Sequence, residues 1–174
     1  MPINAMIGFD AMSLAPELAT RNSTAIFDSM GAVYDQGPIQ IQGMLSRIKF
    51  SSITYENSHA GYVIASYRLP LFTPYLGYSQ VRSAPQAISS PVAPAIKDVL
   101  NNQFIARTHS DQQTVMLGAR WDFQQNMALK VQVDRILGAP KSYFSFRGQT
   151  NAAGSNPPWN GRMSIFSIAL DFVF

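Results

Sequence analysis

Residues 163–174, Met-Ser-Ile-Phe-Ser-Ile-Ala-Leu-Asp-Phe-Val-Phe, contain the pattern that decides the fold. Large apolar residues recur at every second position from Phe166 to Phe174, and Ser167, Ala169 and Asp171 stand between them. Successive side chains of a β-strand point to opposite faces of its sheet. The stretch therefore predicts a strand with one uniformly apolar face and one small or polar face.

The same alternation recurs upstream, most clearly in residues 114–123 and 126–137. It is weaker in residues 25–34, where it puts Phe27 and Val33 on the apolar side and Asp28 on the polar side. We expect about eight strands, a number found in membrane barrels. They are predicted at residues 3–10, 25–34, 38–47, 61–69, 72–82, 114–123, 126–137 and 163–174.

The connections between these strands alternate in length. Residues 35–37, 70–71 and 124–125 are short links, whereas residues 83–113 and 138–162 form long loops. Short and long connections then lie at opposite ends of an antiparallel meander, as in transmembrane β-barrels. We expect one all-β domain spanning residues 1–174. In the first long loop, apolar residues at helical spacing after Pro94 predict a short helix, either an ordinary loop helix or one packed at the barrel rim.

Composition narrows the function classes. The chain has 174 residues, of which 47% are hydrophobic and 13% charged, against about 25% charged in an ordinary soluble domain. It has no cysteine, which excludes disulfides and CxxC sites. Its 13 Lys and Arg residues are dispersed, which argues against nucleic-acid binding. No apolar run is long enough for a transmembrane helix, and residues 1–5 show no signal-peptide pattern.

Polar side chains of the alternating strands would line the interior of a barrel. The candidate set is Asp10, Asp28, Gln40, Gln42, Ser66, Arg68, Arg120, Asp122, Lys130, Gln132 and Asp134. If the link at residues 124–125 brings Arg120 near Lys130, Asp122 and Asp134 can partly neutralise these two cations. Such a wall either sets an ion preference or is salt-bridged and unselective.

Aromatic residues close to the short links predict a girdle at a membrane–water interface. They are Tyr67, Phe72, Tyr75, Trp121, Phe123, Phe172 and Phe174. Amphipathic and aromatic rings at this level are typical of membrane proteins, and of barrels in particular. The alternative is that the same rings pack the core of a soluble β-sandwich.

Four stretches of sequence carry a resemblance to a known family. The alternating C-terminal stretch ending in Phe174 resembles the signal that the barrel-assembly machinery reads in bacterial outer-membrane proteins. Residues 75–79 (Tyr-Leu-Gly-Tyr-Ser), 118–123 (Gly-Ala-Arg-Trp-Asp-Phe) and 128–135 (Ala-Leu-Lys-Val-Gln-Val-Asp-Arg) resemble the C-terminal half of Gram-negative porins, a likeness clearest over residues 61–174.

The resemblance implies a location in the bacterial outer membrane and passive diffusion of small hydrophilic solutes or ions. Porins of this kind have about sixteen strands and act as trimers or monomers, so the chain would be the C-terminal half of such a barrel and a homotrimer would be possible. Its partners would be outer-membrane lipid and the barrel-assembly machinery, with no nucleic acid.

Other functions stay open on the sequence. About eight strands would suit a small barrel with a filled interior, which would serve as a structural anchor or adhesion protein. A soluble lipocalin-like carrier would need a charged outer face. Enzymatic chemistry has little support, because the only histidines, His59 and His109, fall in expected loops. Adjacent His109, Ser110 and Asp111 do not make a triad, which depends on spatial geometry. We expect no enzyme activity, cofactor or metal.

Overall fold

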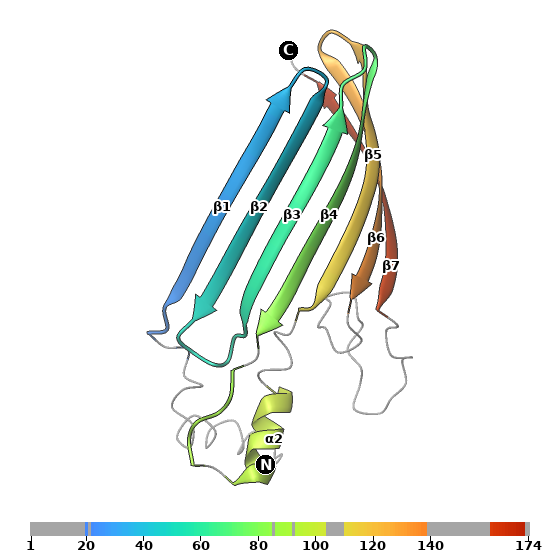
Figure 1. The fold of residues 1–174 in the computed structure, drawn as a ribbon. Coiled ribbons are helices and arrows are strands. Elements are labelled where there is room, and N and C mark those ends of the chain that lie inside the picture. The colour runs from blue at the N-terminus through green and yellow to red at the C-terminus, as the bar shows by residue number, and fades with distance from the viewer. Residues whose placement is uncertain are drawn as a thin grey trace.

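The computed structural model describes residues 20, 22–84, 86–91, 93–103, 110–138 and 161–172. These residues form one sheet of seven strands in sequence order, each antiparallel to the next, and one helix (Figure 1). The elements are β1 (Ala25–Gln36), β2 (Ile39–Phe50), β3 (Asn57–Tyr67), β4 (Phe72–Ala84), α2 (Pro94–Gln103), β5 (Gln112–Gln124), β6 (Met127–Gly138) and β7 (Arg162–Phe172). The predicted all-β fold and the antiparallel meander are confirmed. The strand expected at residues 3–10 lies outside the described residues.

The short and long connections lie at opposite ends of the sheet. Residues 37–38, 68–71 and 125–126 link the strands at one end, here called the turn end, where β7 also finishes. Gly37 adopts a φ of 59°, a left-handed conformation that glycine tolerates and that a tight hairpin turn requires. The opposite, long-loop end carries the segments at 51–56, 85–111 and 139–161, with α2 in the second (Figure 1).

The connection between β2 and β3 is shorter than expected. Both strands run further than the alternation of large apolar residues suggests, and Arg47 pairs in register with His59, and Ile48 with Ser58. Near this end polar residues stand on both faces, so the apolar pattern stops before the backbone ladder does. The backbone hydrogen bonds, which do not depend on side-chain polarity, continue the sheet for several more residues.

Register assigns every strand residue to one of two faces. One face, called the apolar face, carries Met30 and Tyr34 of β1, Ile41 and Leu45 of β2, Val63 of β3, Leu76 and Tyr78 of β4, Val115 and Leu117 of β5, Leu129 and Val133 of β6, and Phe166, Ile168 and Leu170 of β7. The other, called the polar face, carries most of the Ser, Gln, Asp and Lys residues of β4 to β7.

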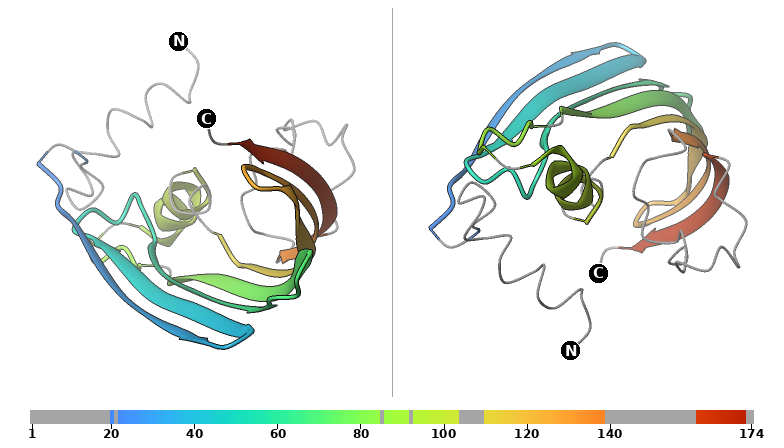
Figure 2. Two further views of the ribbon diagram at one scale, coloured as in Figure 1. Left: turned by 90° about the horizontal axis from the view of Figure 1, so that it is seen from above. Right: turned by 90° about the horizontal axis from the view of Figure 1, so that it is seen from below.

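Exposure shows which face is convex. The sheet is curved into an open arc (Figure 2). On the apolar face Leu45 is 72% exposed, Leu117 62% and Ile168 63%. On the polar face even apolar side chains such as Ile64 and Met116 are partly covered. Side chains crowd together on the concave side of a curved sheet, so the apolar face is the convex one.

The fold has little conventional core. Within the described residues the buried hydrophobic side chains are Ile53, Ile88, Ala128 and Ile136, while every strand exposes at least one large hydrophobic side chain. Exposed apolar area in water costs about 25 cal/mol per Å² relative to burial. An apolar face that is continuous across seven strands therefore requires an apolar surrounding or partner.

A ring lies over a glycine on the polar face and fixes the packing of β4 on β5. Tyr75 pairs in register with Gly118, and a Cβ atom added to Gly118 would overlap the Tyr75 ring. The missing side chain lets the tyrosine cross β5 and reach Gln132 on β6, to which its hydroxyl donates at 2.8 Å.

Replacing Gly118 by valine should therefore destabilise the sheet. The inserted methyl groups have to displace the Tyr75 ring, and overpacking of this kind costs about 1–3 kcal/mol of unfolding free energy. The measurement is urea unfolding of the detergent-refolded protein, with Ala119→Val on the opposite face as the matched control. In a Tyr75→Ala background the Gly118→Val cost should shrink; an unchanged cost would show that the ring is not the obstacle.

Candidate functional site

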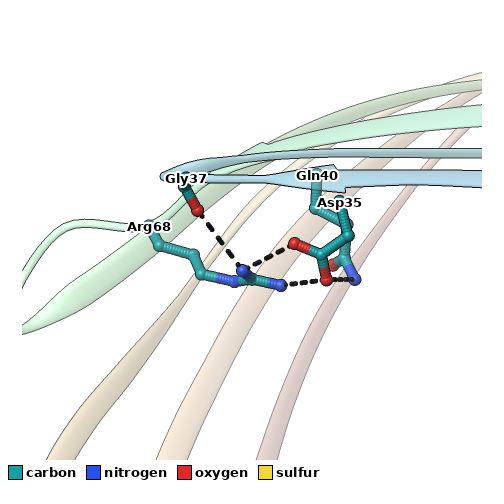
Figure 3. A network of polar contacts seen from close by, with 4 residues as sticks. All are labelled: Asp35, Gly37, Gln40 and Arg68. Carbon is teal, nitrogen blue, oxygen red and sulfur yellow. Dashed lines mark hydrogen bonds and ion pairs between the residues drawn. The ribbon is translucent and has the colours of Figure 1, made fainter.

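Charged side chains of the polar face gather near the turn end in two groups. The first group joins Asp35 of β1, Gln40 of β2 and Arg68, which follows β3 (Figure 3). Arg68 Nη1 donates to Asp35 Oδ1 at 2.7 Å and Nη2 to Oδ2 at 2.6 Å, and Gln40 Nε2 donates to Oδ2 at 3.2 Å. This bidentate pair spans β2 and ties the first hairpin to the end of the third strand. The hydrogen bond to Asp35 raises the pKa of the Arg68 guanidinium.

The second group lies across β5, β6 and β7. Arg120 pairs in register with Lys130, which places two cations directly opposite each other. Like charges in this position repel. The Asp171 carboxylate lies between them, with Oδ2 at 2.8 Å from Lys130 Nζ and 3.8 Å from Arg120 Nη1. Asp122 Oδ1 accepts from Arg120 Nε at 2.8 Å. The four charges therefore neutralise one another.

A cavity of about 680 Å³ lies beside this second group at the turn end. Arg120, Asp122, Ala128 and Asp171 contribute to its lining, together with residues of the turn between β5 and β6. All four charged side chains of the group remain between 42% and 46% exposed. The charges are thus accessible to water and to small solutes from the concave side.

A third polar contact lies further from the turn end. Gln132 Nε2 donates to both carboxylate oxygens of Asp134, at 2.8 and 3.0 Å, while Gln132 Oε1 accepts from Tyr75. The Gln132 amide is thereby held in one orientation, with its oxygen toward β4. A wall of hydrogen-bonded, partly exposed polar groups results.

The structure places the predicted interior residues as follows. Arg120, Asp122, Lys130, Gln132 and Asp134 all stand on the polar face, and Arg68 reaches that face through Asp35. Asp134 bonds to Gln132 and not to the two cations. Asp171 takes the expected neutralising role and was absent from the predicted set. Its place on the polar face follows from the alternation of residues 163–174, whereas its position opposite Ala128 comes from the register.

Asp28 corrects another expectation. It was expected on the polar face, but register places it opposite Arg47 on the apolar face, where the two side chains form a 2.6 Å ion pair. Apolar residues occur on both sides of β1, so alternation alone does not say which side of β1 belongs to the apolar face of the sheet. The pairing of β1 with β2 decides it.

The predicted aromatic girdle is mostly assembled on the apolar face at the turn end. Trp121 pairs with Phe72, its ring contacts that of Phe123 at a centroid separation of 5.4 Å, and Tyr67 and Phe172 lie at the same end of their strands. These five rings are 41–56% exposed. Tyr75 does not belong to the set, because it is three residues from Phe72 and therefore stands on the polar face. Phe174 lies outside the described residues.

No protein-family model matches the chain, and neither a curated protein nor a solved structure matches it. In the described ranges no helix is long and apolar enough to cross a membrane. The same residues hold no cluster of three or more His, Asp or Glu side chains placed to bind a metal ion. Functional interpretation therefore rests on the chemistry of the two sheet faces.

Removing the Tyr75 hydroxyl should test the polar wall. Tyr75→Phe keeps the ring over Gly118 and loses the hydrogen bond to Gln132, and we expect it to lower the unfolding free energy by about 0.5–1 kcal/mol. Tyr78→Phe, on the apolar face three residues away, is the matched control and should have almost no effect. Equal effects of the two substitutions in urea unfolding would contradict the assigned role of the Tyr75–Gln132 bond.

Proposed function

We propose that the seven strands form a sector of the wall of a porin-type barrel in the bacterial outer membrane, through which small hydrophilic solutes or ions diffuse passively. The observation that carries the proposal is the contrast between the two faces. The convex face is apolar and exposed on every strand, whereas the concave face carries charges that neutralise one another. A soluble carrier would show the reverse arrangement.

Strand length supports a membrane-spanning wall. The strands contain 11 to 13 residues. A strand of about 12 residues is about 40 Å long, and a tilt of about 45° reduces its span to about 28 Å, close to the hydrocarbon thickness of a bilayer. The exposed rings of Tyr67, Phe72 and Trp121 then lie at the level of one membrane–water boundary.

Passage through such a wall needs neither a cofactor nor a covalent step. The carboxylates Asp35, Asp122, Asp134 and Asp171 face the basic side chains Arg68, Arg120 and Lys130 on the concave side. Because these charges nearly balance, the described wall supports at most a weak preference for cations. In this proposal β7 at the sheet edge is the strand through which the barrel-assembly machinery acts, and a homotrimer is one form of the finished pore.

Conductance in planar bilayers tests this function. The assembled barrel that contains this sector should give discrete channel openings, and Asp122→Asn with Asp171→Asn should shift the reversal potential toward anion preference, since Arg120 and Lys130 then lose their counter-charges. Asp98→Asn on α2 is the charge-matched control and should leave the reversal potential unchanged. A membrane-inserted, heat-modifiable protein that never conducts would contradict the porin proposal and favour an anchor or adhesion barrel with a filled interior.

The depth of Trp121 gives an independent test of membrane insertion. The chain has two tryptophans, so Trp159→Phe leaves Trp121 as the only indole. In vesicles its fluorescence should be quenched more by lipids brominated near the headgroup than by lipids brominated near the chain ends, because the ring lies at the interface. Absence of quenching by both lipids would refute insertion of the apolar face.

A further inference from the structure

A belt of basic side chains borders the apolar face at the long-loop end. It consists of Arg47 and Lys49 on β2, His59 on β3, Arg82 on β4, Arg135 on β6 and Arg162 on β7. Each lies within three residues of the end of its strand, and all six are exposed. The opposite end of the same face is aromatic. The apolar face is therefore polarised along its strands, with rings at one boundary and positive charge at the other.

Carboxylates of the strands are nearly absent from the apolar face, and Asp111, one residue before β5, lines one pocket with Arg82. Among the described strands, Asp28 is the only acidic residue on the apolar face, and it is paired with Arg47. The other strand carboxylates, Asp35, Asp122, Asp134 and Asp171, stand on the polar face. Acidic and basic strand residues are therefore nearly equal in number on the concave face, whereas basic strand residues outnumber acidic ones on the convex face.

Register brings part of the belt into direct proximity. Arg47 is opposite His59, and His59 is opposite Arg82, so three basic side chains follow one row across β2, β3 and β4. Neighbouring strands are about 4.8 Å apart. Asp28 pairs with Arg47 at one end of the row, with Oδ2 at 2.6 Å from Arg47 Nη2, and Asp111 lines one pocket with Arg82 at the other end. The belt as a whole holds five Arg and Lys side chains against these two carboxylates, so the belt matches an anionic ligand.

An apolar groove runs from this row toward the middle of the face. Its volume is about 390 Å³, and Leu45, Gly61, Val63 and Tyr78 line it, with His59 and Arg82 at its polar end. Gly61 has no side chain and the Leu45 side chain lies over it, so Leu45 and Val63 form the apolar wall of the groove. A ligand that fits the groove therefore has an anionic head at the long-loop end and an apolar chain that extends toward the middle of the face.

We propose that this groove binds an anionic membrane lipid of the leaflet at the long-loop end. One acyl chain lies against Leu45 and Val63, and the headgroup phosphate contacts Arg82 and His59. The rest of the belt, with long side chains that can extend toward the interface, holds further phosphates around the wall. The inference rests on the proposed membrane location of the wall and adds the class of lipid that this face selects.

Lipid titration of the detergent-purified full chain tests the site. Native mass spectrometry would compare phosphatidylglycerol with phosphatidylcholine carrying the same acyl chains. We expect preferential binding of phosphatidylglycerol, a roughly fivefold loss for Arg82→Gln, and retention for Arg82→Lys, since one basic residue near anionic lipid contributes about that factor. Lys97→Gln on α2 is the charge-matched control and should bind like the unaltered chain.

The outcomes separate this inference from the proposed function. Equal binding of the two lipids, or an equal loss in the Lys97 and Arg82 variants, overturns the lipid site whether or not the protein conducts. Selective binding that depends on Arg82, in a protein that inserts without conducting, supports the lipid site and overturns the pore. Correct folding of each variant is checked by its heat-modifiable mobility on gels.

Discussion

The backbone pairing of seven antiparallel strands is the constraint on which the rest depends. A shift of one residue in any pair would move all side chains of a strand to the other face. It would put Lys130, Gln132 and Asp134 among Leu76 and Leu117, and Val131 and Val133 among the charges. The separation of the two faces is therefore a property of register as much as of composition. A β-bulge between Asp122 and Gln124 interrupts the pairing next to the turn, beside the rings of Trp121 and Phe123.

Charge follows the same geometry. The concave-side ion pairs are exposed, and exposed pairs contribute little to stability. Their effect is on the local electrostatic potential. Asp171 offsets the repulsion between Arg120 and Lys130, and Asp35 pairs with Arg68, so the wall is polar but has a weak net field. On the convex side Asp28 is the one acidic residue of the described strands, and it pairs with Arg47. In the proposed function, residues of the same charge types would line a solute path on one face and border lipid on the other.

Much of this arrangement could be predicted from alternation alone. Residues 114–123, 126–137 and 163–174 differ so clearly between odd and even positions that strand, face and neighbours follow directly. The same reasoning failed at β1, because Phe27 and Val33 compete with Met30 and Tyr34 for the apolar face. Contacts between distant residues were also out of reach: Arg68 and Asp35 are 33 positions apart, and no local pattern links them. The faces of Tyr75 and Asp171, by contrast, could have been predicted, since counting alternate positions from Phe72 and Phe172 assigns both residues to the polar face.

If the wall lies in a membrane as proposed, the two boundaries of the convex face also constrain the direction of the sheet. Aromatic rings favour the interface itself, where an apolar body and a polar edge are both accommodated. Guanidinium groups such as Arg82 and Arg135 lie on the opposite boundary, about one bilayer thickness away along the tilted strands, where they can contact phosphates without entering hydrocarbon. Inverting the sheet across the membrane would place these cations in the other leaflet and the long loops on the other side of the membrane. Under the proposed membrane location, lipid charge and loop length therefore favour the same orientation of the sheet.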